Sequence, residues 1–311
     1  MKNRRGIPKP EHGSIEWHRI RHRDEQGRVR FGASEAPVLM GVSKFSNVVD
    51  LAIAKLNEPE VSEPNEAMMR GNRLEPALVD YAAELLGEEV KTPDEMFPMD
   101  RFIATLDGMT IGGETIVECK TTTFYSSDDA LPADYYWQVL AQLGCCPWAS
   151  RVIVVVLDKR MRFGWWEVIR NQDVENDIDA LFYRAQEVAE FIDRGEIPSG
   201  IPLTEDQVKT LYPSPAGEIE LSVGEYDAVR MWMAAKEATK IAEEQEQALR
   251  DNVAGILGNA ESATYAGHKV VSFKARKGSL RLDTKALEQD HPELVANYKK
   301  MGSSTRILKG A

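Results

Sequence analysis

The distribution of apolar residues along the chain predicts several helices. Between residues 65 and 86, apolar side chains recur at steps of three and four, which places them on one face of a helix. They are Met68, Leu74, Leu78, Tyr81 and Leu85. Gly87 follows and favours termination of the helix. Similar spacing predicts helices at 15–21, 133–143 and 174–194, and two short helices within 33–56.

The central part of the chain changes to the spacing expected of strands. Residues 102–106 and 115–121 are predicted to pair as a hairpin that turns at Gly112 and Gly113. Residues 151–157 form a continuous apolar run, typical of a strand buried on both faces, and a further strand is predicted at 163–169. The order helix, hairpin, helix, strand, strand, helix predicts an α/β core with a mixed central sheet flanked by helices.

Proline and glycine are frequent between residues 195 and 217, which indicates a change of organisation. We expect residues 1–200 to form the core domain and residues 201–220 to be a linker. Residues 221–311 are then a small accessory C-terminal α+β unit. Its predicted elements are a long helix, a hairpin and a last helical stretch, at 222–257, 264–275 and 283–300.

The composition excludes several classes of protein. The chain has three cysteines, too few for a disulfide framework, and its cysteines lack the spacing of a zinc ribbon. No apolar run approaches the roughly 20 residues of a membrane span. The N-terminal segment is basic but lacks the apolar core of a secretory signal. We therefore expect a cytoplasmic protein without a membrane partner.

The net charge of −12 argues at first against a nucleic-acid partner, because phosphate binding requires lysine and arginine. Basic residues are, however, concentrated near both ends of the chain, within 1–30 and 269–309. An acidic body with basic ends can still bind a phosphate backbone locally.

Candidate chemistry is concentrated in the predicted hairpin. Asp107-Gly108 follows its first strand, and Glu118-Cys119-Lys120 lies in its second strand. Alternate residues of a strand share a face, so Glu118 and Lys120 point the same way and Cys119 the other. Carboxylate oxygens of Asp107 and Glu118 are ligands that Mg²⁺ prefers, and Lys120 would then lie beside the attacking water. This pattern alone is weak, because an exposed hairpin with a Glu–Lys pair has the same residues.

Further segments strengthen the metal-site interpretation. They are Gly32-Ala33-Ser34-Glu35, the segment Val38–Ser43, Gly71 to Pro76 with Glu75 before the proline, and Tyr135 to Gln142 with Gln138 and Gln142. Together with Asp107-Gly108 and Glu118-Cys119-Lys120-Thr121, over about residues 15–195, they resemble the lambda exonuclease/YqaJ-like viral recombinase family of the PD-(D/E)xK nuclease superfamily. The proline of that superfamily motif is Leu106 here, a position that governs loop geometry and takes no part in the chemistry.

The resemblance implies a restriction-endonuclease-like core and a set of site residues. Asp107, Glu118 and the backbone carbonyl of Cys119 would bind Mg²⁺, as one or two ions that Mn²⁺ can replace. Glu75 would be a further ligand, directly or through water, although by itself it could be a solvated helix residue. Lys120 would position the nucleophilic water, and Gln138 would orient groups near the metal or the substrate.

The resemblance also implies a site for a 5′-phosphate. Ser34 matches the serine of that site, and its arginine is either Arg21, which follows Trp17 on the first helix, or Arg30, which lies closer in sequence. Gln142 lies one helical turn from Gln138 and can face the same site. Glu35 is a further candidate beside Ser34.

The function that follows from the resemblance is a Mg²⁺-dependent exonuclease that degrades duplex DNA from its ends, 5′ to 3′, in phage-type recombination. Expected partners are DNA ends, a RecT- or Bet-like single-strand annealing protein, and further copies of the chain, as a homo-oligomer such as a ring trimer. Two alternatives remain open at this point: an endonuclease of restriction or junction-resolving type on the same fold, and a non-catalytic DNA-binding or assembly module.

Overall fold

The structure is a computed structural model of the chain and describes residues 6–61, 63, 65–278, 280, 282–300 and 307–309. The chain divides into two compact units, Met1–Leu211 and Tyr212–Ala311. The division falls inside the segment predicted as a linker, 201–220. Part of that segment is a helix, α7 (Glu205–Leu211), whose buried Gln207 donates hydrogen bonds to Asn47 and Asp50. Ordered structure of the first unit therefore continues past residue 200.

The centre of the first unit is a five-stranded mixed sheet in the order β3-β6-β7-β8-β9. Its strands are β3 (Val90–Lys91), β6 (Gly108–Thr110), β7 (Thr115–Thr121), β8 (Arg151–Leu157) and β9 (Phe163–Ile169). Strands β7 and β8 are parallel and the other pairs are antiparallel. The predicted α/β core with a mixed sheet is confirmed.

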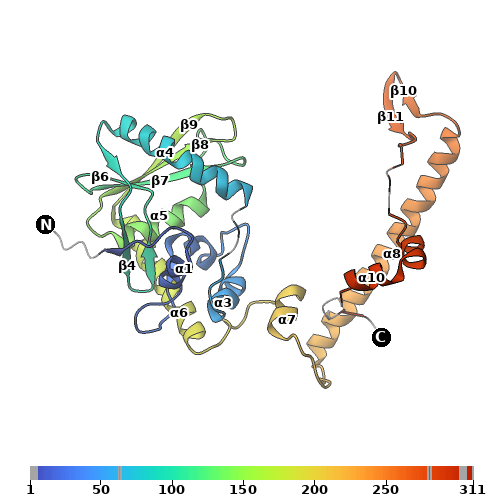
Figure 1. Ribbon diagram of the computed structural model, residues 1–311, viewed down its shortest axis with the longest axis horizontal. Coiled ribbons are helices and arrows are strands. Elements are labelled where there is room, and N and C mark those ends of the chain that lie inside the picture. Colours follow the sequence, from blue (N-terminus) through green and yellow to red (C-terminus); the bar gives the residue numbers. More distant parts are fainter. Residues whose placement is uncertain are drawn as a thin grey trace. The chain divides into compact units, whose positions relative to one another are not determined.

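Helices cover both faces of this sheet because successive residues of β7 and β8 point to opposite sides. Helix α4 (Glu66–Leu86) packs Leu78 and Ala82 against one face (Figure 1). Helices α5 (Ala133–Cys145) and α6 (Gln172–Asp193) pack on the other face. Strand β8 is therefore buried on both sides, as its continuous apolar sequence predicts.

The predicted hairpin is wrong in its first strand. Phe102–Ala104 is β5, which belongs to a second sheet of order β1-β4-β5-β2, and the partner of β7 is β6. The antiparallel neighbour of β5 is β4 (Glu95–Met99). Pro98 lies inside β4, so the sequence did not suggest a strand there. The remaining strands of this sheet are two residues each, β1 (Ile7–Pro8) and β2 (Phe31–Gly32).

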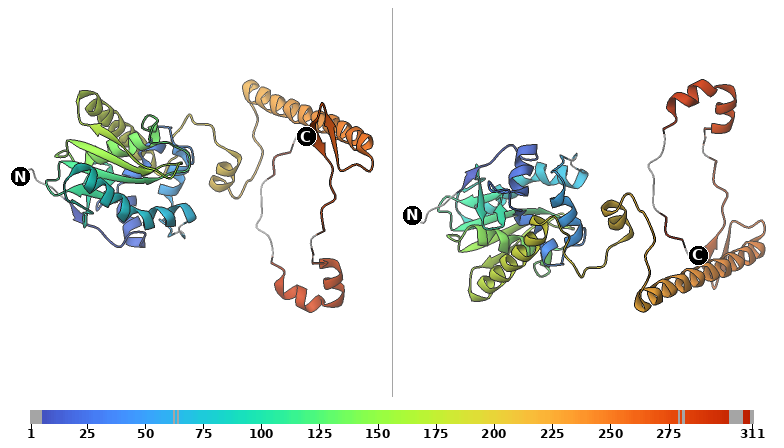
Figure 2. Two further views of the ribbon diagram at one scale, coloured as in Figure 1. Left: turned by 90° about the horizontal axis from the view of Figure 1, so that it is seen from above. Right: turned by 90° about the horizontal axis from the view of Figure 1, so that it is seen from below.

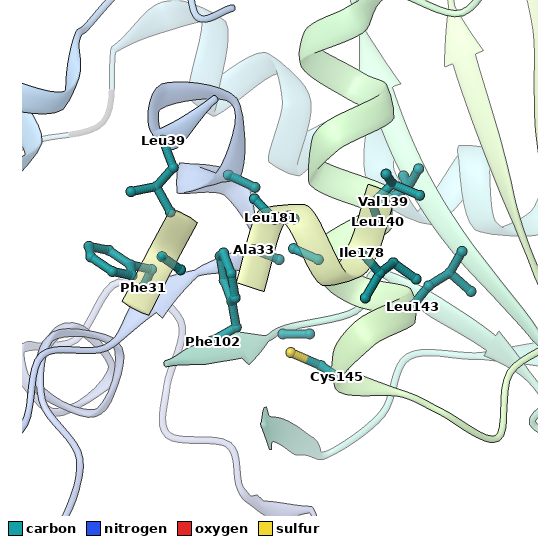
Figure 3. Close-up of a cluster of buried hydrophobic side chains, with 14 of the residues drawn as sticks. Phe31, Ala33, Leu39, Phe102, Val139, Leu140, Leu143, Cys145, Ile178 and Leu181 are labelled. Atoms are coloured by element: carbon teal, nitrogen blue, oxygen red, sulfur yellow. The ribbon is translucent and has the colours of Figure 1, made fainter. Parts of the chain in front are cut away.

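The N-terminal part of the unit packs onto the same core. Its helical elements are α1 (Ile15–His22), the 3-10 turn η1 (Ala33–Glu35), α2 (Ala36–Leu39) and α3 (Val48–Leu56). Figure 3 shows Ala33 among buried side chains that include Phe31, Phe102 and Leu140. The turn η1 is therefore held by the core, which fixes the position of the serine that follows Ala33.

The second unit contains helix α8 (Val223–Leu257), the hairpin strands β10 (Ser262–Tyr265) and β11 (His268–Ser272), and the helices α9 (Thr284–Asp290) and α10 (Pro292–Tyr298) (Figure 2). The predicted α+β composition of this unit is confirmed. The last helical stretch is two helices because Pro292 begins a new one. Among the described residues of the whole chain, no helix is long and apolar enough to cross a membrane.

Candidate active site

A cavity of about 450 Å³ in the first unit contains most of the predicted site residues. They are Arg21, Ser34, Glu75, Asp107, Glu118 and Gln138. These residues come from α1, η1, α4, α5, β7 and the turn before β6, so the fold brings together segments that are far apart in sequence. The cavity volume falls in the range of about 300–1,000 Å³ typical of pockets for small ligands.

Glu118 is the most buried member of the site, at 3% exposure. Its Oε1 atom lies 2.6 Å from Lys120 Nζ, and Gln138 Nε2 donates to the same oxygen at 2.5 Å. Gln142 Nε2 donates to the other oxygen, Oε2, at 2.5 Å. Lys120 also donates to Gln138 Oε1 at 2.8 Å. Glu118 and Lys120 are alternate residues of β7, and the two glutamines lie one turn apart on α5. These spacings point the four side chains toward one another.

Lys120 carries a positive charge at neutral pH. Burial opposes that charge, but Glu118 and Asp107 hold the pKa of Lys120 above its usual value. A protonated ammonium donates hydrogen bonds and cannot accept a proton. Lys120 can therefore stabilise a developing hydroxide, and it cannot act as a general base.

Asp107 and Gly108 connect β5 to β6. A side chain at Gly108 would place its Cβ 2.7 Å from Val90 Cγ1, so glycine is needed where β6 passes β3. The close approach of β6 to β3 places Asp107 beside Cys119, whose backbone N–H donates to Asp107 Oδ2 at 2.8 Å. Burial, and next the neighbouring Glu118 and Glu75, raise the pKa of Asp107 well above its usual value.

Glu75 reaches the cavity from the middle of α4. Pro76, the next residue, lies inside the helix and has no N–H, so the carbonyl of Asn72 loses its helical donor. Asn72 itself lines the cavity. Burial raises the pKa of Glu75, with Lys9 opposing and Glu118 adding to the shift. The Glu-Pro pair thus places an acidic side chain and a free carbonyl on one turn of helix.

The donor set fits a hard divalent cation. Burial and mutual repulsion destabilise the charged form of Asp107, and a cation between the carboxylates would relieve this. In the described part of the chain, no three His, Cys, Asp or Glu side chains are grouped closely enough to hold a metal alone. Mg²⁺ fits such a site because it binds through one or two carboxylates and retains several waters. Cys119 is not an alternative nucleophile, since burial and then Asp107 raise the pKa of its thiol.

A second group of residues in the cavity is built around Arg21. Its Nη2 atom donates to Ser34 Oγ at 2.8 Å, and its guanidinium carbon lies 4.0 Å from the centre of the Trp17 ring. The other side of the guanidinium faces Gly32, where a Cβ would lie 2.1 Å from Nη2. The glycine of the Gly-Ala-Ser-Glu segment therefore leaves room for the arginine.

Arg21 forms no ion pair within the residues that the structure describes. Burial lowers the pKa of its guanidinium, and Glu35 opposes this only from a distance. The Glu35 carboxylate is engaged elsewhere: it accepts from the backbone N–H of Gly32 at 2.7 Å and pairs with the buried Lys55 at 2.9 Å. Arg21 and Ser34 together are thus a positively charged corner suited to a phosphate group.

We expect Gly32→Ala to displace Arg21 and weaken binding of phosphorylated DNA ends about tenfold, the effect of losing one charge-assisted hydrogen bond. Binding of 5′-phosphorylated and 5′-hydroxyl duplexes to the variant, compared by fluorescence anisotropy, checks this. Gly112→Ala is the matched control, because nothing lies within 4 Å of a Cβ at that turn position. Unchanged affinity of Gly32→Ala for the phosphorylated end would contradict the role given to Gly32.

Five predicted site residues are not among the residues that line this cavity: Arg30, Glu35, Cys119, Lys120 and Gln142. Arg30 borders a different cavity and donates from Nη1 to the backbone oxygen of Ile20 at 3.3 Å. Glu35 stabilises the turn η1. Gln142 is fully buried and donates a hydrogen bond to Glu118. Lys120 reaches the site through Glu118 and Gln138.

Six further residues line the cavity that were not predicted as site residues: Lys9, His12, Trp17, Ala33, Asn72 and Thr105. Basic character near the N-terminus was visible in the sequence, but its position depends on the pairing of β1 with β4. Trp17 could have been found from its four-residue spacing to Arg21, which places both on one face of α1.

Comparison with known families shows what this region is similar to. Residues 16–147 match the family model described as the YqaJ-like viral recombinase domain. The resemblance predicted from the motifs is confirmed, and the matched region includes Arg21, Ser34 and the whole of α4, β7 and α5.

The chain has relatives among known proteins. The chain is 26% identical over 297 residues to the protein YqaJ of Bacillus subtilis strain 168, covering 89% of this chain and 91% of that protein. A solved structure of an alkaline exonuclease, LHK-Exo from Laribacter hongkongensis, is 19% identical, with a TM-score of 0.44 over 58% of this chain and 97% of that one. A phage-related exonuclease from Haemophilus somnus 129PT is 13% identical, with a TM-score of 0.44 over 54% and 96%.

Proposed function

We propose that this protein is a divalent-metal-dependent deoxyribonuclease that hydrolyses phosphodiester bonds from the ends of duplex DNA, 5′ to 3′. The observation that carries the proposal is one cavity lined by two chemically distinct groups. The carboxylates Asp107, Glu118 and Glu75 form one group, and Arg21 with Ser34 forms the other. A binding module would gain nothing from carboxylates that face phosphates.

Hydrolysis needs an activated water and a stabilised leaving oxygen. Asp107, Glu118 and the backbone carbonyl of Cys119 would hold Mg²⁺, with Glu75 joining directly or through water. When bound, the cation would supply charge stabilisation for the attacking and leaving oxygens. Within the chain itself, Lys120 would donate a hydrogen bond to the attacking water and stabilise the hydroxide that forms when this water passes its proton to bulk solvent.

Gln138 and Gln142 hold the side chains of Lys120 and Glu118 in place. Gln138 bridges Lys120 and Glu118, accepting from the first and donating to the second. Gln142 fixes the second oxygen of Glu118. With its carboxylate held from three sides, Glu118 cannot rotate away when substrate enters, and the ammonium of Lys120 stays at a fixed distance from it.

The direction of degradation follows from the phosphate corner. Arg21 and Ser34 would bind a terminal 5′-phosphate, which places the next phosphodiester bond of the same strand toward the carboxylates. Removal of nucleotides from a 5′ end leaves a 3′ single strand. A RecT- or Bet-like annealing protein, which pairs such a strand, is the partner that this product needs. A homo-oligomer that encloses the duplex remains a prediction of the resemblance.

The test compares one plasmid in two forms, covalently closed and linear, each incubated with Mg²⁺ or with EDTA. An exonuclease degrades only the linear form, and only with Mg²⁺, because a closed circle offers no end. Nicking or linearisation of the circle would favour the endonuclease alternative. Retention of DNA without cleavage of either form would favour the non-catalytic binding module.

A further inference from the structure

A lysine of the N-terminal segment lies in the wall of the proposed active site. We propose that Lys9 is a DNA-binding residue that holds the phosphate between the first and second nucleotides of the strand being degraded. The proposal rests on the proposed nuclease function and adds a substrate contact to it.

Residues 6–13, which we call the N-terminal arm, are fixed to the body of the first unit. Ile7 and Pro8 pair with Met96 and Glu95 as strands β1 and β4. The backbone N–H of Lys9 donates to the carbonyl of Asp94 at 2.9 Å. The two strand pairs just before Lys9, and the hydrogen bond of its own N–H, leave little freedom to its backbone. The basic charge of the arm is therefore held at the cavity and is not that of a solvated tail.

Lys9 lines the same cavity as Glu75, Asp107 and Arg21. Burial raises the pKa of Glu75, and the charge of Lys9 opposes this shift. Lys9 also acts electrostatically on His12, together with Arg21 at the phosphate corner. The His12 ring contacts Trp17 at 4.7 Å between centroids. Lys9, His12 and Trp17 all line the cavity, and Trp17 contacts both His12 and Arg21.

A bound DNA strand would need a further positive charge in the cavity to balance its phosphates. A DNA strand that enters brings negative phosphates toward Glu75, Asp107 and Glu118. Arg21 compensates the terminal phosphate, and Lys120 is already paired with Glu118. Lys9 forms no ion pair within the described ranges, so its charge is available to a substrate.

Two unpartnered polar atoms belong to residues of the same cavity. Trp17 Nε1 and Thr105 Oγ1 are buried and have no hydrogen-bond partner in the described part of the protein, and both residues line the cavity. Buried polar groups are usually hydrogen-bonded, so unsatisfied ones call for a ligand or water. The substrate strand that passes Lys9 also passes these two residues.

The experiment measures binding without catalysis. Anisotropy titrations in EDTA use a blunt duplex with either a 5′-phosphate or a 5′-hydroxyl, over a range of salt concentrations. Lys9→Met is expected to raise the Kd about tenfold for both duplexes and to reduce the salt slope by about one. Arg21→Ala is expected to weaken binding of the phosphorylated duplex alone. This difference separates the internal phosphate from the terminal one.

Matched variants keep the outcome clear. Lys9→Arg retains the charge and should restore the wild-type Kd, which separates loss of charge from disturbance of the β1–β4 pair. Lys91→Met removes an exposed lysine that pairs with Glu89 outside the cavity and should change nothing. Unchanged binding of Lys9→Met, or a loss confined to the phosphorylated duplex, overturns the proposal. Failure of the wild-type protein to bind either duplex would instead overturn the proposed function and this contact with it.

Discussion

Lys120→Met is expected to lower the rate of DNA cleavage by about 10²- to 10⁴-fold, the usual contribution of a group that assists proton transfer. DNA binding should remain within about twofold, because the charge of Lys120 is already paired with Glu118 and adds little to the attraction for the strand. The physical reason is the charge of Lys120, which Glu118 and Asp107 maintain and which stabilises the forming hydroxide. Single-turnover cleavage of a labelled duplex, with Kd measured in parallel, checks both parts.

Methionine keeps the length and apolar stem of the lysine, so the packing of β7 is largely retained. Lys159→Met, at a partly exposed site whose nearest carboxylate is that of Asp129 at 3.9 Å, is the control for loss of one positive charge. Cleavage by Lys120→Met at the wild-type rate would show that the site is assigned wrongly.

Asp107→Asn is expected to abolish cleavage and, in the absence of metal, to stabilise the fold. The pKa of Asp107 is raised in the folded protein, first by burial and then by Glu118 and Glu75, so its charge destabilises the native state near neutral pH. The amide oxygen of asparagine can still accept from the N–H of Cys119. Each kcal/mol of relieved repulsion raises the melting midpoint by about 2–4 °C in a domain of this size.

The pH dependence of this gain has a defined sign. A carboxyl with a raised folded pKa contributes its full stability below the unfolded pKa of about 3.9 and loses it as the pH rises through the folded pKa. The advantage of Asp107→Asn should therefore grow from acid toward neutral pH and vanish below about pH 4. Thermal unfolding in EDTA at several pH values measures it. A variant less stable than wild type at pH 8 would contradict the electrostatic account of the site.

The sequence predicted most of the elements around the five-stranded sheet, because their patterns are local. Asn65 caps α4 through a hydrogen bond to the N–H of Met68, and Gly87 ends it with a positive φ of 63°. Strand β8 is recognisable from its apolar run. In each case the residues that define the element lie within it, and a period or a capping residue is sufficient.

The second sheet was not predictable in the same way. Strands β1 and β2 have two residues each, and β4 contains Pro98, so none carries a pattern of its own. They exist because each has a partner far away in sequence, as Ile7 has in Met96. The error in the hairpin has the same origin, since the apolar residues after Phe102 suit a strand in either sheet.

The candidate site likewise has a part that local sequence patterns predict and a part that they do not. The shared face of Glu118 and Lys120, and the one-turn spacing of Gln138 and Gln142, could be predicted from geometry within one strand and one helix. The choice between Arg21 and Arg30 could not, because it depends on how the segment between them folds. Lys9 reaches the cavity only through the pairing of β1 with β4, which no local pattern indicates.

The most direct test of the central claim is the order in which two labels leave a linear duplex. The 5′ and 3′ ends carry different fluorophores, each attached to a nucleotide so that the terminal phosphates stay unmodified. The substrate has 5′-phosphates, the reaction is started with Mg²⁺, and early products are separated by size. The proposed function predicts that the 5′ label appears first, in short products, while the 3′ label stays in long single strands, and that EDTA prevents both. Release of the 3′ label first, or of long internal fragments from the start, would contradict it.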